Sequence, residues 1–263
     1  MSVEASASGY RDRNSTADRA LTILEMFHES HLAISATEVA EELSVARSTA
    51  YRYLQSLVSR GFLEESPGGG FRLGLRVIGL SRLARKSYGL SDVALPIMRE
   101  LCERFGYTVL LTRRAGATVT CLEREILPGQ LIRLSYERGS LLPLTAGASA
   151  LTLLAWTPED EARKLLESVE RPRFTEHTLT DVGELLKRLG RIREAGYGIS
   201  RDEVDFGAIG IAAPIFDQRG EVVAALSIVA LGGRVDEQTT AEMITALQEA
   251  GREVAKTLTL VEG

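Results

Sequence analysis

The amino-acid sequence predicts an α+β protein with an N-terminal winged helix-turn-helix, a connecting helix and a larger C-terminal α+β domain. The chain has 263 residues, which is enough for roughly two domains at about 150 residues each. Its first third shows helical periodicity three times and then two short β-type runs, the order of a winged helix-turn-helix. The remainder has strands and helices in blocks without strict β-α-β alternation, which is typical of a mostly antiparallel sheet.

Composition excludes several classes of protein. The longest almost unbroken apolar run, Val222–Leu231, is far shorter than the about 20 residues that a membrane-spanning helix needs, so we expect no membrane partner. The N-terminus is polar and lacks an apolar signal sequence, and only Cys102 and Cys121 could form a disulfide. We therefore expect a cytoplasmic protein. The histidines and cysteines have no paired short spacing, so we expect no metal site.

Positive charge gathers near the N-terminus. Residues 44–89 contain eight Lys and Arg against two acidic residues, whereas the whole chain has a net charge of −5. A basic segment inside an acidic protein suits binding to a polyanion. A solvated helix face that happens to be basic explains the charge alone equally well.

The N-terminal elements follow from apolar spacing, caps and turn residues. Ser35 and Glu38 have the spacing of a capping box at the start of the second helix, and Gly61 ends the third. The expected helices cover Arg19–Phe27, a short segment from Ser35, and Ala46–Arg60; the expected strands cover Phe62–Glu64 and Phe71–Leu73, around a turn at Pro67–Gly70.

The third helix has an apolar face and a face with groups that read DNA. Guanidinium, hydroxyl and phenol groups recognise base edges and phosphates in a major groove. We therefore expect double-stranded operator DNA as a partner. The expected contacts are Arg47, Ser48, Thr49, Tyr51 and Arg52 in the major groove, and Arg72 of the hairpin along the minor groove or the phosphates. The alternative is a small helical domain whose polar face only contacts water.

The segment Leu75–Tyr88 alternates apolar and basic residues and contains no Pro- or Ser-rich linker. This pattern predicts an amphipathic helix that couples the two domains. An ordinary core helix of the second domain is the alternative. The expected division is residues 1–74 for the winged helix-turn-helix, 75–89 for the linker helix and 90–263 for the C-terminal domain.

The C-terminal elements are assigned by the same signals. Thr157 is the expected N-cap of a helix that has Pro158 in its first turn and Asp160 at the capping-box position. The expected helices cover residues 90–105, Thr145–Trp156, a segment from Thr157, Asp181–Ala195, and Asp236 onward. The expected strands cover Thr108–Thr112, Ala117–Glu123, Leu131–Ser135, Tyr197–Ser200, Ala208–Ile215 and Val222–Val229.

The sequence contains no catalytic constellation. Nucleophile-elbow, zincin, Walker and dinucleotide-binding motifs are all absent, so we expect no catalytic residue and no cofactor. His177 lies in a loop with nothing that would orient it, which favours a surface histidine over a catalytic base. Cys121 could sense redox state only with a lowered thiol pKa, and a small buried side chain is the favoured interpretation.

A run of small and hydroxylic residues, Thr145–Ala150, coincides with the expected start of a helix. Free backbone N–H groups at a helix N-terminus favour a carboxylate or a similar anion. Close packing of a helix on a sheet would require the same small residues, and the residues alone do not separate these alternatives.

The ordered motifs resemble the IclR family of bacterial transcriptional regulators over nearly the whole chain. They are Arg19–Glu25, Ala46–Leu54, Phe71–Gly74, Leu142–Leu144, Gly196–Tyr197 and Ile211–Asp217. The resemblance implies a GAF-like effector-binding domain over residues 90–263. It also implies linker helices that help the N-terminal domains to pair, in a dimer or a dimer of dimers.

The resemblance further implies a small organic effector between the helix near Thr145 and the last strands. The matched positions are Ser200, Gly210, Ser227 and Val229, with Asp202 and Glu203 in the adjoining loop. The expected effector contacts are these strand positions and Asp202, together with Thr145, Gly147, Ala148 and Ser149 at the helix start. Many family members have an acidic residue at position 200, a cysteine at 210 and a serine at 229. These departures predict a roomier, less polar pocket, which suits a larger carboxylate or carbonyl compound such as an aromatic acid or hydrazide.

The favoured function is a ligand-responsive regulator that binds DNA. An enzyme or a small-molecule carrier with an added helical N-terminal domain would need a convergent set of reactive groups in the C-terminal pocket. An oligomerising adaptor would use the same basic face to bind an acidic protein instead of DNA.

Overall fold

The computed structural model describes residues 16–28, 30–127 and 137–262. The chain divides after Ala84 into two compact units, and the boundary falls inside helix α4 (Leu75–Tyr88). Each unit has its own hydrophobic core.

The first unit contains three helices and a short hairpin. Its elements are α1 (Thr16–Glu25), α2 (Ala36–Glu42), α3 (Arg47–Ser59), β1 (Leu63–Glu65) and β2 (Phe71–Leu73). The strands are antiparallel, and backbone hydrogen bonds also join Ile34 to Phe71 of β2. Ile23, Val39, Ala50, Leu54 and Leu63 form the centre of the core. The predicted order of three helices and a hairpin is confirmed, although the first helix ends at Glu25, before Phe27.

Local chemistry fixes the ends of these elements. The predicted capping box is present: the Glu38 N–H donates to Ser35 Oγ at 3.2 Å, and the Ser35 N–H donates to Glu38 Oε2 at 2.6 Å. Ser44, in the turn between α2 and α3, has a left-handed backbone with φ of 52°. Gly74 comes directly after β2 and lies close to Gly61. A Cβ added to Gly74 would lie 2.3 Å from the Gly61 carbonyl oxygen. Only glycine fits such a contact.

The second unit is built on a six-stranded sheet with the order β5-β4-β3-β8-β7-β6. All paired neighbours are antiparallel. The strands are β3 (Thr108–Ala115), β4 (Thr118–Glu125), β5 (Leu141–Pro143), β6 (Gly198–Arg201), β7 (Ala208–Phe216) and β8 (Val222–Leu231). The predicted α+β class with a mostly antiparallel sheet is therefore confirmed.

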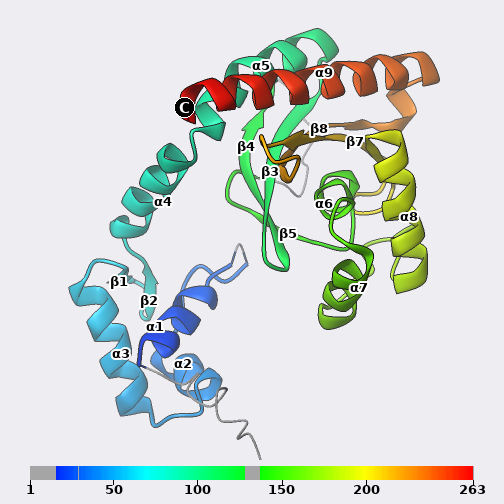
Figure 1. Cartoon of the computed structure of the whole chain (residues 1–263). Coiled ribbons are helices and arrows are strands. Elements are labelled where there is room, and N and C mark those ends of the chain that lie inside the picture. The colour runs from blue at the N-terminus through cyan, green and yellow to red at the C-terminus, as the bar shows by residue number, and fades with distance from the viewer. Residues whose placement is uncertain (1–15, 29, 128–136, 263) are drawn as a thin grey trace, which may run out of the picture. The chain divides into compact units, whose positions relative to one another are not determined.

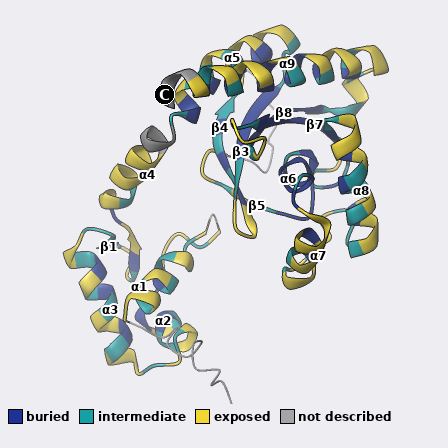
Figure 2. Ribbon diagram, viewed as in Figure 1, coloured by how far each residue is buried: buried dark blue, intermediate teal, exposed yellow. Residues whose placement is uncertain are grey.

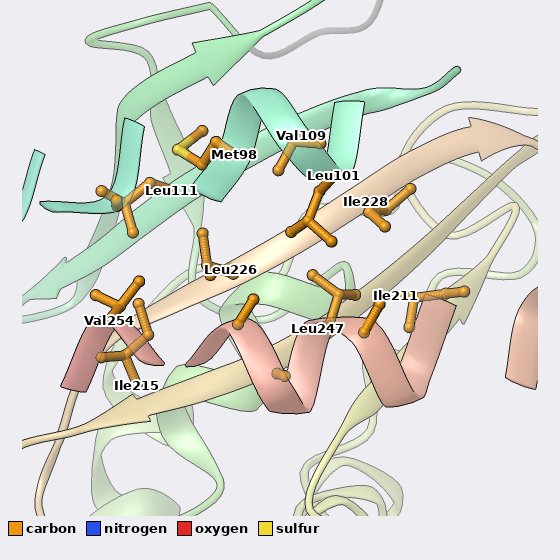
Figure 3. Packing of buried hydrophobic residues seen from close by; sticks show 14 of the residues in the cluster. Met98, Leu101, Val109, Leu111, Ile211, Ile215, Leu226, Ile228, Leu247 and Val254 are labelled. Carbon is orange, nitrogen blue, oxygen red and sulfur yellow. The ribbon is translucent and has the colours of Figure 1, made fainter. Parts of the chain in front are cut away.

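Helices cover both faces of this sheet (Figure 1). On one face α5 (Leu90–Phe105) and α9 (Glu237–Glu262) pack on β3, β7 and β8, and Figure 3 shows Leu101 and Leu247 meeting Val109, Ile211 and Ile228 there. On the other face lie α6 (Ala148–Leu154), α7 (Glu159–Ser168) and α8 (Val182–Ala195). A short 3-10 helix, Gly232–Arg234, precedes α9.

Two expectations for this unit are corrected, and one strand was missed. The helix predicted over Thr145–Trp156 is shorter, because Gly147 with φ of 86° is the N-cap of α6. Thr157 is not the N-cap of α7: the N-cap is Pro158, and the buried Thr157 hydroxyl accepts a long 3.5 Å hydrogen bond from Arg114. The strand β5 at Leu141–Pro143 was not predicted. The predicted strand Leu131–Ser135 falls outside the described residues.

Candidate functional site

Helix α3 has one buried and one exposed face (Figure 2). Ala50, Leu54 and Leu57 are buried. Among the candidate DNA contacts, Arg47, Ser48, Tyr51 and Arg52 are exposed and Thr49 is half-buried. Arg47 and Arg52 therefore present guanidinium groups to the solvent, and Ser48 and Tyr51 present hydroxyl groups.

The hairpin is attached to this helix by polar contacts. Gln55 Nε2 donates to Tyr51 Oη and to Glu65 Oε1, each at 3.1 Å. The ring of Tyr51 also meets Phe71 of β2 edge-on, with 6.0 Å between the centroids. Arg72, exposed on β2, donates from Nη2 to Glu64 Oε2 at 3.1 Å. Such a surface ion pair contributes only about 0–1 kcal/mol, so Arg72 can exchange Glu64 for a phosphate.

A cavity lies in the second unit between α6, the sheet and the loop after β6. Small and apolar side chains form most of the lining, with three serine hydroxyls and two carboxylates among them. The lining residues are Leu110, Leu142, Ala146, Gly147, Ala148, Ser149, Ala150, Ser200, Glu203, Val204, Asp205, Ala208, Gly210, Ser227 and Val229.

The structure brings together most of the expected effector contacts at this cavity. Gly147, Ala148, Ser149, Ser200, Gly210, Ser227 and Val229 line it, whereas Thr145 and Asp202 do not. Thr145 precedes α6 and is buried, and its hydroxyl has no hydrogen-bond partner among the described residues. Asp202 has a left-handed backbone with φ of 57°, and its Oδ1 accepts from the Gly207 N–H at 2.5 Å. Asp202 therefore shapes the loop that carries Glu203, Val204 and Asp205.

Hydrogen bonds connect the strands to α6 inside the cavity. The Ala148 N–H donates to Ser200 Oγ at 3.1 Å, and Ser149 Oγ donates to Ser227 Oγ at 2.9 Å. Gly210 leaves the room for this arrangement, because an added Cβ would lie 3.0 Å from Ser200 Oγ. A larger side chain at position 210 would push Ser200 away from α6.

Glu203 is the buried carboxylate of the cavity. Arg188 Nη2 of α8 lies 3.2 Å from Glu203 Oε1. The backbone carbonyl oxygen of Glu203 accepts a 2.6 Å hydrogen bond from Thr178 Oγ1. Burial raises the pKa of the Glu203 carboxyl, while Arg188 and a hydrogen bond from the Gly147 N–H act in the opposite direction. From the sequence, its neighbour Asp202 was expected among the effector contacts, and Glu203 only in the same loop. The turn geometry, which a sequence does not show, decides which of the two side chains points inward.

In the described part of the chain, the histidine and the cysteines that the sequence analysis considered have no reactive surroundings. No group of three or more His, Cys, Asp or Glu in that part could hold a metal ion. His177 is exposed, and its Nε2 lies 3.7 Å from Glu176 Oε1. Both cysteines are buried and free, and burial raises the pKa of the Cys121 thiol to about 12. No helix in residues 16–28, 30–127 or 137–262 is long and apolar enough to cross a membrane.

Comparison with known proteins identifies both units. Residues 16–67 match the IclR helix-turn-helix domain, and residues 83–256 match the C-terminal domain of bacterial IclR transcriptional regulators. The chain is 30% identical over 245 residues to the transcriptional regulator XynR of Escherichia coli K12, covering 92% of this chain and 96% of XynR. It is 32% identical over 223 residues to KdgR of the same strain, covering 84% of each chain.

Solved structures agree with this assignment. An IclR homologue from Microbacterium hydrocarbonoxydans, crystallised with 4-hydroxybenzoate, is 30% identical and has a TM-score of 0.79, over 94% of this chain and 100% of that one. An IclR regulator from Alicyclobacillus acidocaldarius is 25% identical with a TM-score of 0.80, over 92% and 97% of the two chains. The curated relatives are named as transcriptional regulators, which are not enzymes. The chain belongs to the IclR family of bacterial transcriptional regulators, with a helix-turn-helix DNA-binding domain and a C-terminal IclR effector domain.

Proposed function

We propose that this regulator binds operator DNA through α3 and the β1–β2 hairpin and responds to a small organic effector held in the cavity beside α6. The exposed polar face of α3 is the observation that carries the proposal. In the proposed division, residues 1–74 bind DNA, residues 75–89 link the two functions and residues 90–263 sense the effector.

The side chains of α3 suit a major groove. Arg47 and Arg52 supply planar guanidinium groups for base edges or phosphates, and Ser48, Thr49 and Tyr51 supply hydroxyls. Arg72 on the hairpin suits a phosphate or the minor groove, since its pairing with Glu64 is exposed and weak. Contacts of this kind release counterions, so the affinity should fall steeply with salt.

The proposed effector is a partly apolar carboxylate or carbonyl compound, of the size of an aromatic acid or hydrazide. The apolar lining and the serine hydroxyls support this class. A relative whose crystals contain 4-hydroxybenzoate supports a ligand of this size. An effector that binds one conformation more tightly shifts the population and with it the affinity for DNA.

We include self-association, as a dimer or a dimer of dimers, in the proposal. One winged domain contacts too few base pairs for good specificity, and paired half-sites supply the rest. Leu75, Ile78 and Leu83 on α4 are 73%, 65% and 55% exposed, and a partner chain would cover such apolar side chains. Light scattering on the full chain should give at least twice the monomer mass.

A gel shift with the DNA upstream of the protein's own gene tests the DNA-binding part. We expect a discrete shift that survives excess nonspecific competitor and weakens between about 50 mM and 200 mM salt. The variant Arg52→Glu should lose it, because a carboxylate replaces a cation on the exposed face of α3. Arg219→Glu, exposed on the β7–β8 turn, makes the same charge change and should retain it. Unchanged binding by Arg52→Glu would remove Arg52 from the contact surface.

Calorimetry on the full chain tests the size of the effector. Benzoate and benzohydrazide should bind more tightly than glyoxylate and pyruvate, because the ring covers apolar lining that two- and three-carbon acids leave exposed. Tighter binding of the two small acids would contradict the proposed effector class.

A further inference from the structure

One backbone donor at the start of α6 is already occupied by an acceptor of the chain itself. The Ala148 N–H donates to Ser200 Oγ at 3.1 Å. The backbone of Gly147 acts on the Glu203 carboxyl and opposes the rise in its pKa that burial causes. An effector carboxylate that came to this helix start would have to displace a serine hydroxyl and would lie beside a buried carboxylate.

The charge of the lining is also unfavourable for an anion. Glu203 and Asp205 both line the cavity, and among the described residues that line it none is Lys, Arg or His. Arg188 of α8 is engaged: its Nη2 lies 3.2 Å from Glu203 Oε1 and also donates to the carbonyl oxygen of Ile199. Among the lining residues that the structure describes, a second carboxylate would meet like charge without a cation to compensate it, which disfavours its ionised form.

The same groups suit an uncharged polar ligand. A carboxylate such as Glu203 only accepts hydrogen bonds, so it matches N–H or O–H donors on an effector. The hydroxyls of Ser149 and Ser227, 2.9 Å apart, can turn to donate to a carbonyl oxygen. An amide or hydrazide carries both kinds of group at once, whereas a carboxylate carries acceptors alone.

We propose that Glu203 makes the cavity select an uncharged effector of the carboxamide or hydrazide class over the carboxylate of the same shape. This inference rests on the proposed function, because it concerns the same cavity. It narrows the effector class by charge, whereas the size of the effector follows from the apolar lining. Glu203 acts here as a specificity residue that contacts the polar end of the ligand.

Matched pairs of ligands test the proposal directly. Benzamide with benzoate, and 4-hydroxybenzamide with 4-hydroxybenzoate, keep the shape and change only the charge. In calorimetry on the full chain, each amide should bind at least about tenfold more tightly than its acid. The Glu203→Gln variant should bring each pair to within about threefold, because the neutral amide side chain repels no carboxylate. Glu249→Gln, exposed on α9, makes the same charge change and should keep the wild-type ratio.

The other possible results of these titrations also test the selection of an uncharged effector. Tighter binding of the acids to the wild-type protein would overturn the selection and leave the proposed sensor function intact. If Glu203→Gln does not fold, Asp205→Asn replaces it and should lower the ratio of acid to amide Kd, and an unchanged ratio would count against the charge argument. Absence of binding by every member of both series, with no effect on the DNA gel shift, would overturn the proposed effector and this inference with it.

Discussion

At the scale of single residues, Cys121 illustrates how burial controls chemistry. It lies on β4 with no exposed surface, and the resulting thiol pKa of about 12 leaves almost none of the reactive thiolate near neutral pH. Cys102 on α5 is also buried, and burial raises its pKa. We expect iodoacetamide at about pH 8 to label neither cysteine in the folded protein and both after unfolding in guanidinium. Rapid labelling of Cys121 in the native protein would reopen redox sensing.

Glu203 gives the stability of the protein a dependence on pH. Its pKa is raised by burial above the usual 4.5. The folded protein therefore binds a proton at a pH where the unfolded chain has released it, so the free energy of unfolding falls as pH rises through this window. Arg188 of α8 and the Gly147 N–H limit the shift, and Asp205 lines the same cavity.

Thermal unfolding of Glu203→Gln measures this contribution. Glutamine does not titrate, so the melting temperature of the variant relative to wild type should increase from about pH 5 to pH 8. Glu249→Gln on the surface of α9 serves as the control and should show no such trend. A constant difference for Glu203→Gln would mean that Arg188 fully compensates for burial.

The candidate site could be predicted from the sequence only through the resemblance to the IclR family. Ser200, Gly210, Ser227 and Val229 were expected because they match the family position by position, and all four line the cavity. The choice between Asp202 and Glu203 required the left-handed backbone at Asp202, which turns its carboxylate onto the Gly207 N–H. A short polar loop carries no periodicity, so its sequence does not reveal which side chain enters a cavity.

At the scale of elements, the contact between α9 and β7 depends on a glycine. An added Cβ on Gly251 would lie 2.7 Å from the Pro214 carbonyl oxygen, a distance that requires the helix to move. Gly251→Ala should therefore lower the free energy of unfolding by about 1–3 kcal/mol, measured by urea denaturation. Gly190→Ala on α8 has open space around the new Cβ and should instead raise it by about 0.5–1 kcal/mol. Equal effects of the two substitutions would contradict the close packing of α9.

Two element ends with local chemical signals were predicted correctly, whereas one helix start and one short strand depend on contacts that are distant in the sequence. The capping box at Ser35 and Gly61 after α3 are local signals that the structure uses. Thr157 also has the side chain of an N-cap, but its hydroxyl is buried towards Arg114. Strand β5 exists because Leu141–Pro143 pair with Thr118–Thr120 of β4. A three-residue strand of this kind has no pattern of its own, since its partner lies elsewhere in the sequence.

At the scale of the whole molecule, charge is divided along the chain in agreement with its two tasks. Residues 44–89 are basic, while the net charge of the chain is −5. An acidic remainder limits nonspecific attachment to DNA, which agrees with the proposal that α3 and the hairpin make the contacts. Binding of an uncharged effector would also add no negative charge to the second unit, which is already acidic.

The two proposed binding events must be coupled equally in both directions. If an effector such as 4-hydroxybenzamide weakens DNA binding by a given factor, saturating DNA must weaken effector binding by the same factor. We expect about 5- to 150-fold, the usual range of such coupling. Calorimetric titration of the effector with and without the operator fragment, beside gel shifts with and without effector, measures both factors.

The Arg52→Glu variant separates coupling from simple damage to the fold. Its substitution lies on the exposed face of α3, so the cavity should bind the effector with the wild-type Kd. Adding operator DNA should then leave that Kd unchanged, because the variant no longer binds DNA. A loss of effector binding in Arg52→Glu without DNA would show that the substitution damages the fold. Unequal factors for the wild-type protein would show that the effector and DNA do not act on one shared equilibrium.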